Sequence, residues 1–285
     1  MIKELELRFT KMHGAGNDYI FIDGRGLSED WPSVAIAMSN RHTGVGSDGI
    51  ILALPSSHAD VRMVMFNADG SEGKMCGNGI RCLVDFAKGK NFFPDSISPV
   101  IVETAGGDRQ VTPILENGQI INAAVQMGEP IFKSAEVPVN VANLEKVVDY
   151  PIQIDSYSFE ITCVSMGNPH AVLFTNDPVD QYPLDKIGPQ VETMDIFPEG
   201  VNFEIVNVHD AGNVSARVWE RGSGLTMACG TGACAIAVVG WLKGLTGDVV
   251  TVKLPGGNLT IKWPGYGNVI MEGPVQEVFE GEWRP

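Results

Sequence analysis

The chain has 285 residues, of which 44% are hydrophobic and 19% are charged. Such a length holds one large or two smaller domains, and the composition is that of a globular protein rather than a disordered one. The formal net charge of −15 repels nucleic acid and anionic lipid, so neither a nucleic acid nor a membrane is an expected partner.

The sequence shows neither a membrane-spanning segment nor an export signal. No segment approaches the roughly 18 apolar residues of a membrane helix, and the first residues lack the apolar core of a signal peptide. The sequence therefore favours a cytoplasmic protein. An odd, sparse number of cysteines argues against a disulfide framework and indicates free thiols in a reducing compartment. The five are Cys76, Cys82, Cys163, Cys229 and Cys234.

In chain order, short strands dominate the predicted elements and helices are few. Runs of β-branched and aromatic residues predict strands over 61–66, 100–104, 203–208 and 214–219. Residues 249–254 and 259–263 predict a hairpin around the Gly-rich turn 255–258. The clearest helices cover about 78–88 and about 231–243. The second is apolar nearly all round, which is typical of a helix buried inside a sheet structure.

An internal repeat organises these elements. A C-G-x-G pattern occurs at Cys76 and again at Cys229, and the offset between them is 229 − 76 = 153 residues. The same offset aligns Asn67 with Glu220, each at the end of a predicted strand. A Gly-Asn pair precedes each cysteine by about 60 residues, at Asn17 and Asn168. A repeat this long indicates duplicated domains, because solenoid repeats are only 20–50 residues long.

The predicted fold is therefore α/β (α+β) with two pseudo-symmetric domains and an active site in the cleft between them. Each domain is expected to be a mostly antiparallel sheet or barrel wrapped around a central helix. The first domain covers 1–125 and carries Cys76, and a C-terminal strand within 275–285 returns to it. The second domain covers 126–274 and carries Cys229.

The C-G-x-G pattern in front of a helix has a chemical meaning. A cysteine at a helix start faces about half a positive elementary charge and several unpaired backbone N–H groups. Such positions favour thiolate and lower a cysteine pKa from about 8.5 to about 3.5–7.5. The flanking glycines let a ligand approach the backbone, whose amides then bind a carboxylate or phosphate. One loop thus supplies a base and an anion-binding site.

Two such loops predict two-base chemistry. One thiolate removes a proton from a carbon while the opposing thiol returns one on the other face, so that the configuration inverts. Amides of two helix N-termini would stabilise the charge that develops on the carboxylate. No P-loop, dinucleotide fingerprint or H-E-x-x-H motif is present, so no cofactor is expected. The cysteines lack zinc-knuckle spacing and the histidines are scattered, so no metal is expected.

Several segments together resemble one known family, the diaminopimelate epimerases. The resemblance rests on K-M-H-G-A-G-N-D-Y at 11–19, R-H-T-G-V-G at 41–46, F-N-A-D-G-S at 66–71, M-C-G-N-G-I-R-C at 75–82, M-G-N-P-H at 166–170 and E-R-G-S-G-L-T-M-A-C-G-T-G-A at 220–233. These matches run in order along almost the whole chain. The resemblance implies a cytoplasmic homodimer that interconverts LL- and meso-2,6-diaminopimelate for lysine and peptidoglycan precursor synthesis without a cofactor.

Matching positions imply the roles of individual residues. Cys76 and Cys229 would be the acid–base pair, and His170 and Glu220 would tune their ionisation. Substrate contacts would come from the residues that match the family's binding motifs, namely Asn17, Asn67, Gly77, Asn78, Asn168, Asn202, Glu220, Arg221, Gly230 and Thr231. A neutral asparagine pocket suits a zwitterion, and a buried arginine fork suits a carboxylate. Cys82, Cys163 and Cys234 are expected to be buried packing residues.

The chain departs from some relatives at single positions. Gly49 stands where some have a substrate-contacting Gln, Val201 where many have Thr, and Phe279 where some have a Tyr at the dimer contact. Three alternatives to this family stay open at this point. They are a proline- or hydroxyproline-type racemase of the same fold, a cofactor-free isomerase without a cysteine pair, and a non-catalytic small-molecule binding protein.

Overall fold

A computed structural model describes residues 6–142 and 144–284 of the chain. Their contacts form two compact units, one comprising 6–125 together with 273–284 and the other comprising 126–272. In the part of the chain that is described, no helix is long and apolar enough to cross a membrane.

The first unit is built on one continuous sheet. Strand β18 pairs with β1, and the sheet continues through β2, β3, β4, β6 and β7 to β8. Only the β2–β3 and β4–β6 pairs are parallel. The elements are β1 (Leu7–Gly14), β2 (Asn17–Asp23), α1 (Trp31–Ser39), β3 (Gly49–Leu54), β4 (Val61–Asn67), β5 (Glu72–Gly73), α2 (Gly77–Gly89), β6 (Val100–Glu103), β7 (Arg109–Glu116), β8 (Gln119–Gly128) and β18 (Gln276–Trp283).

The second unit repeats this arrangement strand for strand. Its sheet runs from β9 through β10, β11, β12, β13 and β15 to β16 and β17, and β11–β12 and β13–β15 are its parallel pairs. The elements are β9 (Tyr150–Ile154), β10 (Tyr157–Ser165), β11 (Pro169–Phe174), the 3-10 turn η1 (Val179–Gln181), α3 (Leu184–Glu192), β12 (Asn202–Asp210), β13 (Asn213–Glu220), β14 (Gly224–Leu225), α4 (Gly230–Leu242), β15 (Val249–Leu254), β16 (Gly257–Lys262) and β17 (Val269–Pro274).

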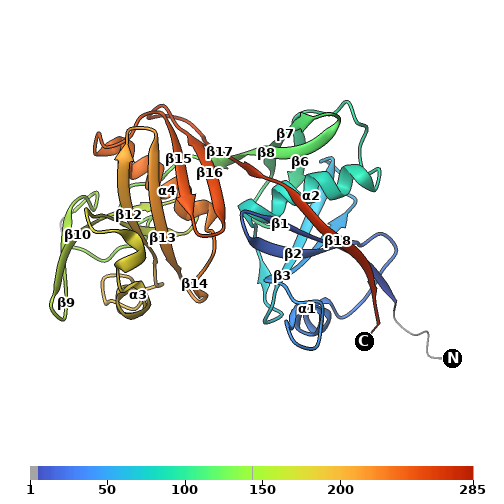
Figure 1. Cartoon of the computed structure of the whole chain (residues 1–285), viewed down its shortest axis with the longest axis horizontal. Helices are drawn as coiled ribbons and strands as arrows, with labels where there is room; N and C mark the ends of the chain where they lie inside the picture. The colour runs from blue at the N-terminus through green and yellow to red at the C-terminus, as the bar shows by residue number, and fades with distance from the viewer. Residues whose placement is uncertain (1–5, 143, 285) are drawn as a thin grey trace. The chain divides into compact units, whose positions relative to one another are not determined.

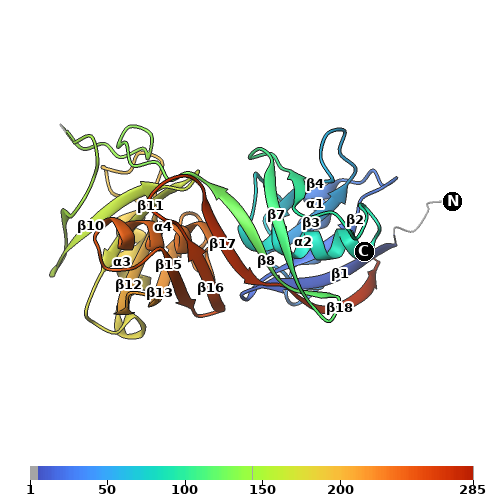
Figure 2. The same cartoon turned by 90° about the horizontal axis from the view of Figure 1, so that it is seen from above.

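One helix lies inside the curve of each sheet. In the first unit α2 contacts β1, β2, β3, β4 and β7, and in the second α4 contacts β10, β11, β12, β15 and β16 (Figure 2). Because strands from both ends of a sheet touch the same helix, the sheet wraps around it. Both helices are 13 residues long, and the offset of 153 residues that relates the cysteines also relates these helices.

A second helix covers the other face of each sheet. In the first unit α1 packs Val34, Ala35 and Met38 against the β1–β4 side chains, and in the second α3 packs Leu184, Ile187 and Val191 against β10–β12. Both faces of these strands are therefore buried, and alternate residues of one strand belong to different layers. The chain's last strand, β18, is drawn red in Figure 1 and runs antiparallel to β1.

Most sequence expectations for the elements are confirmed. The mixed α and β class, the two central helices, the hairpin of β15 and β16 and the return of the last strand to β1 are all present. The sequence analysis missed α1 and α3. Helix α1 begins after Asp30, whose side chain accepts from the Ser33 amide, and it has Pro32 in its first turn. Helix α3 contains Pro189, which weakens the helical pattern of its sequence.

The central helix α4 offers a test of the packing. Ile236 is fully buried in it, whereas Leu242 near its end is 39% exposed. We expect Ile236→Ala to lower the free energy of unfolding by about 2–5 kcal/mol, because it removes buried methylene groups and leaves a cavity. The matched control Leu242→Ala should cost less than about 1 kcal/mol. Urea denaturation of the full chain measures both, and equal losses would contradict a buried α4.

Candidate active site

Cys76 caps the N-terminus of the central helix of the first unit. It has extended backbone angles, with φ of −128° and ψ of 119°, and its sulfur accepts a hydrogen bond from the Gly79 amide at 3.3 Å. The sulfur thus takes the position of a capping oxygen, next to the unpaired amides of the first helical turn. A Cβ on Gly79 would lie 2.5 Å from the Ile51 Cδ1 atom, so a side chain there would require the end of the Ile51 side chain to move.

A small polar cluster surrounds the Cys76 sulfur. The thiol donates to the Oδ1 atom of Asn17 at 3.3 Å, and the Nδ2 group of Asn78 donates to the same oxygen at 3.3 Å. The Asn17 amide is in turn oriented by Asp48, whose carboxylate accepts from Nδ2 at 2.6 Å. Tyr19 is adjacent: burial raises the pKa of its phenol well above the ordinary value, and the neighbouring Cys76 raises it further.

A buried arginine supports this loop from below. Arg81 is fully buried on α2 and donates to the Gly77 carbonyl and to the Asn78 Oδ1 atom, both at 3.1 Å. Its Nε group donates to the Pro274 carbonyl at 3.4 Å. The guanidinium therefore holds both residues that follow Cys76.

Cys229 caps the central helix of the second unit in the same way. Its backbone is extended, and its sulfur accepts from the Gly232 amide at 3.3 Å. The expectation of an acidic thiol is wrong for Cys229 in this structure. Burial raises the pKa of the Cys229 thiol well above its ordinary value, and the carboxylates of Glu220 and Glu204 raise it further. Desolvation of a thiolate outweighs the favourable helix dipole here.

A chain of hydrogen bonds leads away from the Cys229 sulfur. The Thr231 hydroxyl lies 3.5 Å from the sulfur, and it accepts from the Asn168 Nδ2 group at 3.3 Å. The Oδ1 atom of Asn168 lies 3.0 Å from His170 Nε2, and His170 Nδ1 lies 2.6 Å from Glu204. The structure thus brings four residues of the second unit, Asn168, His170, Glu204 and Thr231, together around Cys229.

Other residues that the sequence analysis selected lie at strand ends, Asn202 and Glu220 in the second unit and Asn67 in the first. Asn202 is buried and joins two segments, since its Nδ2 group donates to the Pro169 carbonyl and its Oδ1 atom accepts from the Arg221 amide. Glu220 accepts from the Thr226 hydroxyl. Asn67, at the end of β4, donates to the Ser71 hydroxyl at 2.9 Å.

Arg221 differs from the expectation of a buried arginine fork. The residue is exposed, and its guanidinium donates to the Glu199 carbonyl at 2.9 Å. The turn after β13 carries it outward, and its stem passes close to Gly200, which has a φ of +72°. Its charged end is therefore in reach of solvent and of a ligand, rather than shielded from water.

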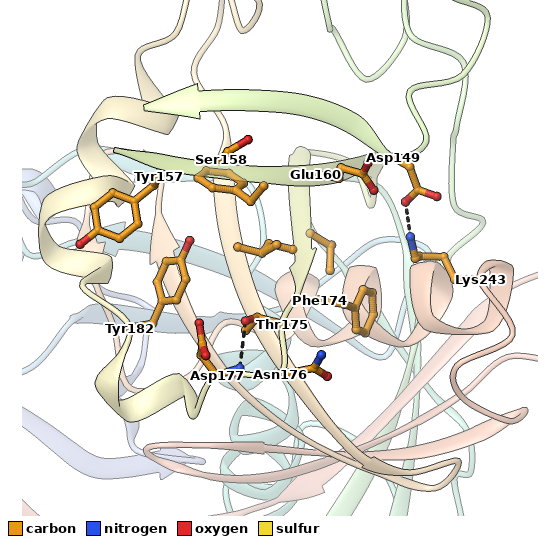
Figure 3. A pocket seen from close by; sticks show the side chains of 13 residues that line it. Asp149, Tyr157, Ser158, Glu160, Phe174, Thr175, Asn176, Asp177, Tyr182 and Lys243 are labelled. Atoms are coloured by element: carbon orange, nitrogen blue, oxygen red, sulfur yellow. Dashed lines mark hydrogen bonds and ion pairs between the residues drawn. The ribbon is translucent and has the colours of Figure 1, made fainter. Parts of the chain in front are cut away.

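A half-open hollow of the second unit lies away from Cys229. Its volume is about 480 Å³ and its lining includes Tyr157, Tyr182 and Lys243, with Lys243 paired to Asp149 (Figure 3). Lys243 is the C-cap of α4, whereas Cys229 is its N-cap. Thirteen helical residues separate the two ends by about 20 Å. The hollow therefore does not include the Cys229 sulfur.

Comparison with known proteins gives the family. The model of the diaminopimelate epimerase family matches residues 9–133 and 162–278. A diaminopimelate epimerase of Methanococcus maripaludis strain S2 is 46% identical over 278 residues, covering 97% of this chain and 99% of the relative. The chain belongs to the diaminopimelate epimerase family. A relative of the same name from Acetivibrio thermocellus is also 46% identical, over 97% of this chain and 98% of its own length.

A solved structure shares the fold. A hydroxyproline epimerase from Agrobacterium vitis, with bound trans-4-hydroxy-L-proline, superposes with a TM-score of 0.70 at 16% identity, over 100% of this chain and 94% of that one. Membership of the diaminopimelate epimerase family confirms the resemblance that the sequence motifs indicated. It also confirms the assignment to the isomerases that racemise or epimerise.

The structure places four residues around the two cysteines to which the sequence analysis gave no role. Arg81 lies inside a quoted motif, and its position four residues after Gly77 on a helix could have indicated the contact to that carbonyl. Tyr19 ends the quoted motif at 11–19, and Asp48 lies two residues after the motif at 41–46. Glu204 gave no signal, because a glutamate in the middle of a strand is usually on a solvent face.

Arg81 provides a test of how the Cys76 loop is held. We expect Arg81→Met to lower the free energy of unfolding by about 3 kcal/mol, because buried acceptors at Gly77, Asn78 and Pro274 lose their donor. The control Arg8→Met removes a side chain that is 86% exposed and pairs with Glu282 at the surface, and it should cost less than about 1 kcal/mol. Denaturation curves measure the free energy of unfolding of both variants. Similar losses in the two would argue against the role of Arg81 as a buried hydrogen-bond donor.

Proposed function

We propose that this protein interconverts LL- and meso-2,6-diaminopimelate without a cofactor, using the Cys76 and Cys229 side chains as an acid–base pair. The observation that carries the proposal is the duplicated cap: each sulfur sits at the N-terminus of a buried helix and accepts from the amide three residues on. Relatives that carry the name diaminopimelate epimerase and align over nearly the whole chain support the choice of substrate.

The chemistry follows from the helix starts. A thiolate takes the proton from the carbon that bears the amino and carboxylate groups, the C–H electron pair moves onto that carbon and its carboxylate, and the other thiol delivers a proton to the opposite face. Amides in a first helical turn have no acceptor within the helix, so those of Gly77, Gly230 and Thr231 can donate to the carboxylate, and the Asn78 side chain would assist. Such preorganised donors stabilise the charge that develops on it.

The two thiols start from different states in this account. Burial and two nearby carboxylates raise the pKa of Cys229, which favours its protonated form. Cys229 is therefore ready to give a proton, and Cys76, which is half-buried, is the side that takes one. In the reverse direction the roles exchange, because the product leaves Cys229 as the thiolate and Cys76 as the thiol.

The remaining residues would bind the rest of the substrate. Asn17 and Asn168 lie within the hydrogen-bonded clusters around the two sulfurs and carry neutral amides that suit a zwitterion. We assign the distal amino-acid end to the asparagines, with Asn67 and Asn202 as further members. Glu220 and the exposed Arg221 would meet the ammonium and a carboxylate, and Glu220 and His170 would tune the sulfurs.

The racemase alternative has less support. The relatives that match over nearly the full length carry the diaminopimelate name, whereas the hydroxyproline epimerase is similar at 16% identity and supports the fold alone. A proline-type ring substrate has one amino-acid centre, so it needs no second set of amides. A purely binding protein would have no use for two capped thiols.

We also place the enzyme in the cytoplasm as a homodimer. All five cysteines are free thiols, which suits a reducing compartment. A second copy is the expected occupant of the outer face of β18, where Val278 is 53% and Phe279 44% exposed on an edge strand. An edge strand with unpaired backbone groups is prone to pairing, so a partner that covers it removes that hazard.

The first test of the proposal concerns the two sulfurs. Cys76→Ala and Cys229→Ala should each reduce kcat for LL-diaminopimelate by about 10²–10⁴-fold or more, because each removes one acid–base group. Cys163→Ala is the matched control, since Cys163 is also a buried thiol but lies on β10, and it should keep its turnover. Exchange of the α-hydrogen in D₂O, followed by NMR under reducing conditions, measures the reaction.

Two outcomes would contradict this proposal. Full epimerisation by either cysteine variant would remove the two-base mechanism. Exchange of the α-hydrogen of proline or hydroxyproline, with none for diaminopimelate, would be compatible with the two-base mechanism but would contradict diaminopimelate as the substrate.

The dimer has its own test. Phe279→Glu puts a charge into the proposed interface and should convert a dimer of about twice the 30.7 kDa chain mass into monomers. Sedimentation velocity measures the mass, and Tyr266→Glu is the control, because Tyr266 is 77% exposed but lies in the second unit. A wild-type chain that sediments as a monomer would refute the homodimer.

A further inference from the structure

Glu204 is a buried carboxylate to which the mechanism above assigns only an effect on the pKa of Cys229 and no hydrogen-bonding role. It is fully buried in the middle of β12, and its Oε1 atom lies 2.6 Å from His170 Nδ1. Its Oε2 atom has no hydrogen-bond partner among the described residues. A buried carboxylate is unfavourable without partners, so its presence beneath a reactive thiol requires an explanation.

The hydrogen bonds that start at Glu204 have a defined direction. The Oδ1 atom of Asn168 can only accept, so His170 Nε2 must carry the hydrogen that lies between them. Asn168 then donates from Nδ2 to the Thr231 oxygen. The Thr231 oxygen keeps its own hydrogen when it accepts from Asn168, so it can donate that hydrogen to the Cys229 sulfur, 3.5 Å away, whenever the sulfur is a thiolate.

The duplicated fold provides an internal comparison. The parallel pair β2–β3 aligns Ile20 with Ile50, and β11–β12 aligns Ala171 with Phe203. Superposing the two registers puts Glu204 at the position of Ile51, with the offset 204 − 51 = 153 that also relates the cysteines. It puts His170 at the position of Tyr19, with the offset 170 − 19 = 151.

The glycine of each cap shows the same relation. A Cβ at Gly79 would meet the Ile51 side chain, and a Cβ at Gly232 would meet the Glu204 Oε1 atom at 2.9 Å. Glu204 and Ile51 therefore occupy equivalent places against the two capped helices. In the Cys76 half this place is filled by a hydrocarbon, so neither the fold nor the cap requires a carboxylate there.

We propose that Glu204 is a positioning residue of the Cys229 half, which holds His170 and, through it, Asn168, so that Thr231 presents its hydroxyl hydrogen to the Cys229 sulfur. The inference rests on the proposed function. A hydrogen bond donated to sulfur favours thiolate, so it opposes the effect of burial each time Cys229 gives up its proton. Glu204 never exchanges a proton with the substrate and does not touch it.

Two substitutions at Glu204 separate positioning from packing. Glu204→Ile introduces the residue that stands at the equivalent position of the Cys76 half, and it removes the hydrogen bond to His170. It should lower kcat/KM for LL-diaminopimelate by about 10–100-fold. Glu204→Gln can donate its amide hydrogen to His170 Nδ1 while Nε2 keeps its own, so it should stay within about threefold of wild type. Ile51→Val is the matched control at the equivalent position and should change little.

A measurement without substrate keeps this inference distinct from the proposed function. Nitrogen–proton NMR of the His170 ring should show a slowly exchanging Nε2–H in the wild type and in Glu204→Gln, and its loss in Glu204→Ile. A wild-type ring without hydrogen on Nε2 would overturn the inference, as would full activity of a folded Glu204→Ile. If the ring behaves as expected but diaminopimelate is not turned over, the proposed function fails and the positioning role stands.

If Glu204→Ile does not fold, Glu204→Gln and the wild type still test the positioning role of Glu204. A folded Glu204→Gln that loses activity as severely as a cysteine variant would mean that the carboxylate charge itself is needed, which contradicts positioning. Activity near wild type together with a retained Nε2–H would support it.

Discussion

The structure depends on one interaction that occurs twice, the capping of a buried helix by a cysteine sulfur. Side-chain oxygens usually accept at this position, and sulfur is a weaker acceptor. The weaker cap is tolerated because the helices are stabilised by packing: α4 is buried along nearly its whole length inside its sheet. The sulfur is consequently held beside the first-turn amides, which have no acceptor within the helix. In the proposed function, cap, anion site and acid–base group are thus one local structure.

Burial of the helix also disfavours ionisation of the thiol that caps it. The same packing that fixes Cys229 also removes water from its sulfur, and the raised pKa of this thiol follows from that. Helix dipoles act over the first turn and at most contribute about 2 kcal/mol, whereas burial can shift a pKa by several units. In the proposed mechanism, local hydrogen bonds such as one donated by Thr231 to a Cys229 thiolate supply the stabilisation that the helix dipole does not. This accounts for the polar residues that gather around a cap that is otherwise apolar.

The sequence predicted the fold class, the central helices and their caps because these follow from local patterns and from a visible repeat. It did not predict α1 or α3, whose sequences are short or carry a proline, so tertiary packing decides them. It also assigned Arg221 to a buried fork, although the turn after β13 brings it to the surface. Glu204 could not be found from alternation, since both faces of β12 are covered and a polar residue between Phe203 and Ile205 looks solvent-facing.

Duplication explains both the likeness and the difference of the two halves. A repeated unit supplies two equivalent thiols, but inversion at one carbon needs a donor and an acceptor at the same moment, so two identical environments would work against each other. The scaffold keeps what both halves need, namely the capping sulfur, the glycine three residues on and the neighbouring asparagine. The layer beneath has diverged, with Tyr19 and Ile51 in one half and His170 and Glu204 in the other. Since this layer is packed against the caps but lies outside the first-turn amides, its chemistry can change while the anion site stays intact.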